Sequence, residues 1–593
     1  MCGLSGELRL DGRPADVAAV ARMTAAMERR GPDGVGVLAA GPVALGHRRL
    51  KIIDLSERAA QPMADAELGL TVVFNGCIYN YRELRDELTA AGYRFFSTSD
   101  TEVVLKAFHR WGPRCVDHFA GMFAFAVHER DTGRLVLARD RLGIKPLYVT
   151  ADAHRIRFAS TLPALLAGGG VDTDIDPVAF HHYLSFHAVV PPPHTILRGV
   201  RKLPQATIRV IDPDGTSRDE VYWRPAFTRG PEHAGWTAAD WRDAVAERLR
   251  VAVRRRMVAD VPVGVLLSGG LDSSMIVALL AEAGQADLAT FSVGFEAAGG
   301  ESGDEFHYSD IVAKQFATDH HQILIPSDAL PRAVDAAVAA MSEPMVSHDC
   351  VAFYLLSQEV SRHVKVVQSG QGADEVFAGY SWYPPLAGTR RDQAVDAYLR
   401  VFADRSHTDL AAIVAPSHLI EADASRHLVA EHFGAPGAET AVDAALRIDS
   451  LIMLVDDPVK RVDNMTMAAG LEARTPFLDH ELVELAAACP PELKLAAGGK
   501  GVLKDISRAL LPAEVIDRPK GYFPVPAIRH LSGPLLDRVA SALTDPAARA
   551  RGLFRAQWVE AMLAAPNDNR TNLGANALWQ AALLEMWLQA QGV

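Results

Sequence analysis

A cysteine at the second position is the residue of this chain with the clearest potential for chemistry. Removal of the initiator methionine would leave Cys2 with both a thiol and a free α-amine. An α-amino group titrates near pKa ~8 and can take the proton of its own thiol, so such a residue acts as a nucleophile without a histidine partner. Chance also places cysteines at this position. The rest of the chain must therefore supply the other parts of a site.

A glycine turn after a short apolar run is a second feature of this kind. The run 263–267 leads into Ser-Gly-Gly-Leu-Asp-Ser-Ser at 268–274, and an apolar helix is predicted to follow. Backbone N–H groups and the positive end of a helix favour phosphate, and glycines let its oxygens approach the backbone. The lysine that ends a Walker phosphate loop is absent, so a γ-phosphate kinase mechanism is not indicated. A tight strand-to-helix turn without a ligand is the simpler alternative.

A second polar loop, Ser-Gly-Gln-Gly-Ala-Asp-Glu at 369–375, follows the predicted strand Val-Lys-Val-Val at 364–367. In a parallel sheet both loops lie at the carboxyl ends of strands, where ligands bind. Magnesium is commonly held by one or two carboxylates together with phosphate oxygens. Asp272 and Asp374 are therefore predicted to share one Mg²⁺ with a nucleotide pyrophosphate. The alternative is that both carboxylates only cap helices.

The first third of the chain has the patterns of a mixed α and β domain. Helical spacing predicts helices over 17–27 and 81–91. Two apolar runs, 123–127 and 135–138, flank Asp-Thr-Gly at 131–133, which predicts an antiparallel hairpin. Turn-rich sequence then predicts a boundary, with one domain over 1–215, a linker over 216–240 and a second domain over 241–593.

The second domain alternates apolar runs with helical stretches. The predicted strands are 261–267, 289–295, 321–325 and 364–368. This alternation predicts a parallel, doubly wound sheet. Beyond about residue 385 the pattern is mostly helical.

Composition excludes several classes of protein. A chain of 593 residues is too long for one core, and its 73 acidic against 60 basic residues disfavour nucleic acid and anionic membranes as partners. Its five scattered cysteines form no metal-ligand or disulfide pattern, as expected for a reducing cytoplasm. Neither a signal peptide nor ~18 uninterrupted apolar residues is found, so secretion and membrane spanning are disfavoured.

Taken together, these motifs resemble the asparagine-synthetase family of glutamine amidotransferases over nearly the whole chain. The resemblance implies an α+β N-terminal-nucleophile sandwich, followed by an α/β ATP-pyrophosphatase domain with a helical C-terminal part. It implies ATP and Mg²⁺ as cofactors and small molecules as substrates, and it leaves a homodimer open. The matching segments are Cys2-Gly3, 30–34 (Arg-Gly-Pro-Asp-Gly), 46–50, Asn75-Gly76, 99–102, 268–274, 471–479 and 518–522.

For the first domain the resemblance implies a glutaminase. The Cys2 thiolate would attack the glutamine amide, and its amine would relay the proton to ammonia. The Asn75 side chain and the Gly76 N–H would form the oxyanion hole. Arg49 would hold the glutamine carboxylate, which a guanidinium can bind through both oxygens, and Asp100 would pair with the α-ammonium. Surface ion pairing is the simpler alternative for these last two residues.

For the second domain the resemblance implies adenylation of an acceptor carboxylate, which ammonia then converts to an amide. Lys520 would stabilise charge on the α-phosphate and the tetrahedral intermediate, unless it is only a solvated loop lysine. Gln371 would contact the acceptor. The implied ATP-binding residues are Leu267, Ser268, Gly269, Gly270, Asp272, Ser273, Val293, Ser369 and Gly370, with Asp272 and Asp374 as metal ligands.

Two positions depart from the family pattern. Cys77 stands where the family has glutamate in Asn-Gly-Glu-Ile-Tyr-Asn, so Asp100 would carry more of the ammonium recognition. Gln371 stands where the family has glutamate in Ser-Gly-Glu-Gly, and an amide cannot act as a carboxylate base. These departures, with segments 295–301 and 345–350, resemble the N-acetylglutaminylglutamine amidotransferases, which amidate an acetylated dipeptide to an osmoprotectant. We favour this acceptor over aspartate.

Two other functions remain open. A β-lactam-synthetase-like cyclase would use the ATP site without ammonia, but Cys2 argues against it because such enzymes are expected to lack a working glutaminase. A catalytically silent glutamine- or nucleotide-binding regulator would tolerate loss of the nucleophile and metal carboxylates, which this chain retains. Absence of glutamine hydrolysis by protein with a processed Cys2 would favour the regulator.

Overall fold

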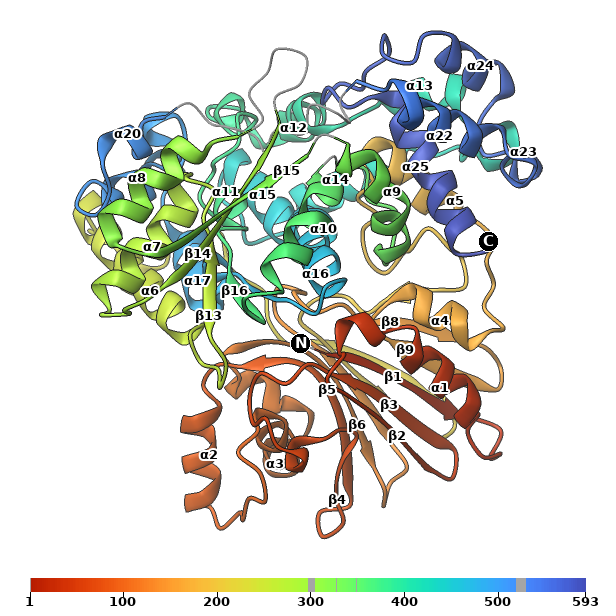
Figure 1. Cartoon of the computed structure of the whole chain (residues 1–593), viewed down its shortest axis with the longest axis vertical. Coiled ribbons are helices and arrows are strands. Elements are labelled where there is room, and N and C mark those ends of the chain that lie inside the picture. The colour runs from red at the N-terminus through yellow and green to blue at the C-terminus, as the bar shows by residue number, and fades with distance from the viewer. Residues whose placement is uncertain (1, 297–303, 327, 348, 519–529) are drawn as a thin grey trace.

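The computed structural model describes residues 2–296, 304–326, 328–347, 349–518 and 530–593. Two domains are stacked along the long axis of the molecule (Figure 1). The N-terminal domain contains two sheets, and the C-terminal domain contains a third sheet surrounded by helices. Among the described residues, no helix is both long and apolar enough to cross a membrane.

The N-terminal domain is built on two antiparallel six-stranded sheets. Strands are given in their spatial order. The first sheet consists of β10 (Arg201–Lys202), β8 (Tyr148–Ala151), β9 (Arg155–Ala159), β1 (Gly3–Arg9), β3 (Val43–Arg49) and β2 (Gly34–Ala40). The second consists of β12 (Ser217–Val221), β11 (Thr207–Ile211), β7 (Leu135–Arg139), β6 (Gly121–Glu129), β5 (Leu70–Ile78) and β4 (Met63–Asp65).

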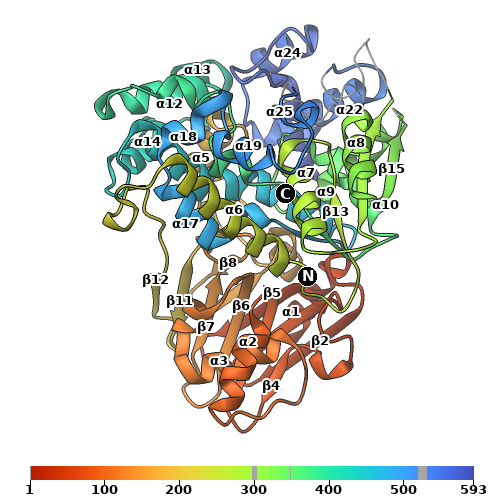
Figure 2. The same cartoon turned by 90° about the vertical axis from the view of Figure 1, so that its left-hand side faces the viewer.

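These sheets form the predicted sandwich. Inward side chains such as Leu4, Leu45, Val73, Leu137 and Phe158 form one buried cluster between them. The outer faces are covered by helices that lie on opposite sides of the domain in Figure 1, and Figure 2 views the domain from the side of α2 and α3. The first sheet is covered by α1 (Val17–Ala25) and α4 (Leu162–Gly168), and the second by α2 (Tyr81–Ala90) and α3 (Asp100–Trp111).

Local predictions for this domain agree with the structure, with one correction. Both predicted helices form, and β6 pairs with β7 in the predicted antiparallel hairpin. However, β12 lies inside the predicted linker 216–240 and pairs with β11 at the edge of the second sheet. All five residues of β12 are exposed, so this strand lacks the apolar alternation that would have revealed it.

The C-terminal domain contains a parallel five-stranded sheet. Its order is β15 (Asp319–Ile325), β14 (Ala289–Phe295), β13 (Val263–Leu266), β16 (Val366–Gln368) and β17 (Glu472–Arg474). The four predicted strands are all present, whereas β17 was not predicted as a strand. From β13, the chain first adds β14 and β15 on one side and then β16 and β17 on the other. The direction in which strands are added therefore changes between β13 and β16, and ligands of doubly wound folds bind at such a point.

Helices cover both faces of this sheet, as a doubly wound fold requires. One face packs on α6 (Ala238–Arg255), α7 (Leu271–Glu282) and α8 (Phe306–Phe316), and the other on α9 (Ala329–Ala340), α10 (Asp349–Val360) and α16 (Lys460–Met467). The mostly helical remainder agrees with prediction. Its longer helices are α12 (Ala394–Phe402), α14 (Ala424–Gly434), α15 (Ala441–Ile448), α17 (His480–Ala488), α22 (Gly533–Thr544), α24 (Ala556–Ala564) and α25 (Ala577–Ala590).

Candidate active sites

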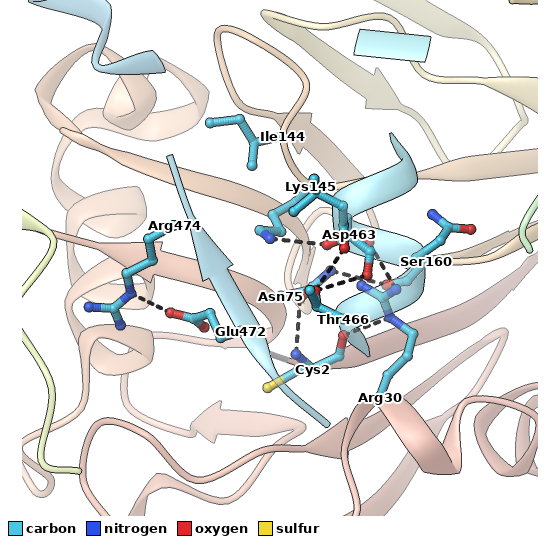
Figure 3. Close-up of polar contacts among 12 residues, drawn as sticks. Cys2, Arg30, Asn75, Ile144, Lys145, Ser160, Asp463, Thr466, Glu472 and Arg474 are labelled. Atoms are coloured by element: carbon cyan, nitrogen blue, oxygen red, sulfur yellow. Dashed lines mark hydrogen bonds and ion pairs between the residues drawn. The ribbon is translucent and has the colours of Figure 1, made fainter. Parts of the chain in front are cut away.

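Cys2 directly precedes β1, where the first sheet meets the C-terminal domain (Figure 3). Its side chain is buried and lines a cavity of about 30 Å³. The Cys2 nitrogen donates a hydrogen bond of 3.0 Å to Asn75 Oδ1 on β5 of the second sheet. This nitrogen would become the α-amine on removal of Met1, so Asn75 is placed to orient it.

Opposing effects act on the Cys2 thiol. Burial is the larger effect and raises its pKa, although the charge of the chain's amino terminus, the Leu50 backbone and Arg49 act in the opposite direction. Gly76 lines the same cavity, and a Cβ there would meet the Met122 carbonyl oxygen at 2.2 Å. Only glycine therefore allows β5 and β6 to approach so closely beside the nucleophile.

Three residues, Arg49, Asn75 and Asp100, were predicted to bind glutamine. Arg49 and Asp100 line this cavity with Cys2, whereas Asn75 contacts the Cys2 nitrogen from beside it. Arg49, the last residue of β3, donates to the carbonyl oxygens of Ser56, at 2.7 Å, and Asp54. Its guanidinium thus orders the following loop. Asp100 opens α3 and accepts the Ile78 N–H at 3.1 Å, and burial raises the pKa of its carboxyl to about 6.

Two residues from the other domain also line this cavity and were not predicted to belong to it. Glu472 and Arg474 of β17 form a buried ion pair of 2.6 Å. Burial alone would raise the pKa of Glu472, but the amino-terminal charge and Arg474 outweigh burial and lower this pKa to about 2. Arg474 Nη2 also lies 3.6 Å from Cys77 Sγ, the residue that replaces the family glutamate. Glu472 of the second domain thus places a carboxylate near Cys77, the position where the family pattern has a glutamate.

A shared aspartate links the nucleophile's backbone to the second domain. Arg30 Nε donates to the Cys2 carbonyl oxygen at 3.3 Å, and its Nη1 lies 2.9 Å from Asp463 of α16. Lys145 Nζ lies 3.0 Å from the other oxygen of Asp463 (Figure 3). All three side chains are buried, so loss of one would leave an unpaired charge inside the domain junction.

The second cavity has a volume of about 460 Å³ and lies beyond the carboxyl ends of β13, β14 and β16. Of the residues predicted to bind ATP, acceptor and metal, all those described except Gly269 line it. Lys520 lies outside the described residues. The predicted residues along the cavity wall are Leu267, Ser268, Gly270, Asp272, Ser273, Val293, Ser369, Gly370, Gln371 and Asp374.

Two serine side chains fix the shape of the loop after β13 through hydrogen bonds to its backbone. Ser273 Oγ accepts the Ser268 N–H at 3.2 Å, and Ser268 Oγ accepts the Gly270 N–H at 3.3 Å. Gly269 has φ +69°, and a Cβ there would lie 2.6 Å from the Ser309 nitrogen. The turn thus requires glycine both for its conformation and for the approach of α8.

Asp272 and Asp374 converge as predicted, but the cation between them is a lysine. Lys500 Nζ lies 2.6 Å from Asp272 Oδ2 and 2.9 Å from Asp374 Oδ1. Although burial acts against the charged form, the two carboxylates raise the pKa of Lys500. The prediction placed magnesium at this point. It missed Lys500 because this residue lies more than a hundred positions from either loop, although Gly-Gly-Lys-Gly at 498–501 is itself a signal for a polar turn.

Two models of known protein families match this chain. Residues 1–223 match the glutamine amidotransferase domain, and residues 244–589 match asparagine synthase. The chain belongs to the asparagine synthetase family. Members of this family are glutamine-hydrolysing, ATP-dependent amidotransferases. The first cavity lies mainly in the first matched segment, with Glu472 and Arg474 added from the second, and the larger cavity lies in the second matched segment.

Several relatives match along most of their length. The chain is 30% identical to asparagine synthetase [glutamine-hydrolyzing] 3 of Bacillus subtilis, covering 88% of this chain and 87% of that protein. It is 33% identical to a putative asparagine synthetase of Mycobacterium tuberculosis H37Rv, covering 89% and 88%. It is 27% identical to asparagine synthetase B of Escherichia coli, covering 84% and 77%.

The raised pKa of Asp100 gives a test of its expected role in this family. An ionised carboxylate should bind the glutamine ammonium, and burial raises the pKa to about 6. Below this pH the carboxyl becomes neutral, so kcat/KM for glutamine should fall. Asp100→Asn should lower kcat/KM at neutral pH by roughly 10-fold or more and remove this acid limb. Glutaminase rates between about pH 5 and 8 measure both effects.

Asp86→Asn, an exposed position on α2 of the same domain, is the matched control. It should retain the full rate and the full pH profile. An acid limb that persists in Asp100→Asn would assign the titration to another group and leave Asp100 without the proposed role.

Proposed function

We propose that this protein uses ammonia from glutamine and energy from ATP to amidate a peptide-like acceptor, N-acetylglutaminylglutamine, rather than aspartate. The observation that supports a changed acceptor is Gln371 in the wall of the larger cavity, beside Asp272 and Asp374. The family glutamate at this position is replaced by a neutral amide, which can orient an acceptor through hydrogen bonds but cannot accept a proton as a base.

In the first cavity, the Cys2 thiolate attacks the glutamine amide carbon and forms a thioester, and the α-amine transfers the proton to the leaving ammonia. Asn75 Oδ1 orients that amine through the 3.0 Å contact. The Asn75 amide N–H and the Gly76 N–H stabilise the oxyanion. Arg49 and Asp100 bind the α-carboxylate and α-ammonium, and Glu472 adds a negative charge on the ammonium side.

In the second cavity, the loop at 268–274 binds the phosphates of ATP while the acceptor carboxylate attacks the α-phosphate and releases pyrophosphate. Asp272 and Asp374 suit Mg²⁺, because two carboxylates converging on one point are its usual protein ligands. When bound, the ion would neutralise pyrophosphate charge. Lys500, whose ammonium both carboxylates hold, lines the same cavity and would contact phosphate oxygens, and Lys520 is assigned to the α-phosphate.

The acceptor is tested by incubating protein with a processed Cys2 with glutamine and Mg-ATP. Aspartate and N-acetylglutaminylglutamine are offered separately, and AMP and amide products are followed by mass spectrometry. Dipeptide amide with AMP supports the proposal. Asparagine would overturn it and would show that a glutamate at position 371 is dispensable for asparagine synthesis.

Gln371→Glu tests the position directly, with Gln358→Glu, an exposed glutamine on α10, as its matched control. A carboxylate at position 371 should alter the ratio of kcat/KM values for the two acceptors, whereas the control should not. Unchanged kinetics in Gln371→Glu would remove this residue from the acceptor site.

A further inference from the structure

Two histidines and an aspartate lie close together at a point outside both cavities. His181 belongs to α5 (Pro177–Ser185), His407 opens α13 (His407–Ile413), and Asp423 caps α14 (Ala424–Gly434). One ligand atom of each lies within 4.8 Å of the others. The helix α5 lies in the segment matched by the amidotransferase model, and α13 and α14 lie in the segment matched by asparagine synthase.

The spacing of these atoms suits a tetrahedral metal. His181 Nε2 lies 3.0 Å from His407 Nδ1 and 3.8 Å from Asp423 Oδ1. Ligand atoms about 2.0–2.1 Å from a tetrahedral zinc ion lie roughly 3.3 Å from one another, between these two distances. Imidazole nitrogens with one carboxylate form a donor set that suits zinc, and a water molecule commonly completes its coordination.

The surrounding structure fixes the direction of each ligand. His181 Nδ1 lies 3.0 Å from Ser425 Oγ, which is also 3.0 Å from His182 Nδ1. This hydroxyl can accept the His181 N–H, which leaves the Nε2 lone pair directed at the other two ligands, as in known metal sites. Asp423 Oδ1 accepts the Arg426 N–H at 2.9 Å, which holds this carboxylate at the start of α14.

We propose that His181, His407 and Asp423 bind one divalent transition-metal ion, with zinc as the expected ion. The ion would join α5 to α13 and α14 and so stabilise the packing of the amidotransferase segment on the helical part of the second domain. It would have no part in either reaction, so the inference is independent of the acceptor proposed above. A direct hydrogen bond between His181 and His407 is the competing explanation of their 3.0 Å contact.

The test uses the full chain after dialysis against chelator. Calorimetric titration with zinc chloride should show one site with a dissociation constant in the micromolar range or below, and thermal unfolding should shift upward with zinc. Cobalt(II), which reports coordination geometry by its visible absorption, should give a tetrahedral spectrum. Excess magnesium should not compete, because nitrogen ligands do not suit it.

Three variants and one control make the test specific. His407→Ala and Asp423→Asn should each abolish the site, and the asparagine keeps a side-chain oxygen to cap α14. Ser425→Ala should weaken zinc binding by roughly 10- to 100-fold through loss of the hydrogen bond to His181. His427→Ala, an exposed histidine on the same helix α14, should leave binding unchanged.

The proposal is overturned if the unaltered chain binds zinc no more tightly than His407→Ala does. It is also overturned if the cobalt spectrum is the same in the unaltered chain and in Asp423→Asn. Either outcome would leave the His181–His407 contact as a hydrogen bond only. Because zinc binding and thermal unfolding are measured without substrate, these outcomes do not depend on any result for the acceptor.

Discussion

Replacing Cys2 with alanine is expected to abolish glutamine-dependent amidation while ammonia-dependent amidation continues. The thiol is the only nucleophile assigned to the first cavity, so glutamine hydrolysis should fall by roughly 10³-fold or more. The second cavity lies in the other domain and contains none of the atoms removed. A rate with ammonium chloride within about twofold of the unaltered enzyme is therefore expected.

The measurement compares amide formation with glutamine and with ammonium chloride as nitrogen sources. Cys115→Ala is the matched control, since this cysteine is also buried in the N-terminal domain but lies outside both cavities. It should retain both activities. Retained use of glutamine by Cys2→Ala would refute the assignment of the nucleophile.

Replacing Asp272 with asparagine is expected to stop amidation from both nitrogen sources. Asp272 Oδ2 lies 2.6 Å from Lys500 Nζ, and Asp374 holds the same ammonium. Loss of one carboxylate weakens any magnesium site at this point and removes a partner that orients Lys500. Because adenylation precedes use of ammonia, both rates should fall by roughly 10²- to 10³-fold, a range typical for loss of one charge-stabilising group.

Glutamine hydrolysis by this variant should continue, which separates it from Cys2→Ala. Glu282→Gln, at the end of the same helix α7 and paired there with Arg250, is the control and should have normal rates. Circular dichroism on heating would verify that Asp272→Asn is folded. Ammonia-driven synthesis by the folded variant would show that this carboxylate has no role in adenylation.

Structural features that follow from a short stretch of sequence, such as the limits of a strand, could be predicted. The strand β14 is a mostly apolar run between turns, and its predicted limits agree with the structure. The loops after β13 and β16 are placed at one cavity because parallel strands end at the same edge of a sheet. The roles assigned to their residues stay predictions.

The remaining features depend on contacts between distant segments. The strand β17 has three residues, two of them charged, so its sequence does not indicate a buried strand. Lys500 reaches Asp272 across 228 positions, and Arg30 reaches Asp463 across 433. No periodicity within a window of the chain encodes such pairs. Lys500 and Asp272 meet only when the second domain folds, and Arg30 and Asp463 meet only when the two domains pack together.

The short strand β17 forms part of the wall of the first cavity and also bonds to a loop that lines the second. The Arg474 side chain faces Cys77 and Glu472, while its backbone carbonyl accepts the N–H of Ser369, at 2.8 Å, in the phosphate-side loop. A displacement of β17 by a nucleotide or acceptor would therefore alter the shape and charge of the glutamine cavity. One three-residue strand thus connects the walls of both sites, and the two sites share a moving part as well as a chain.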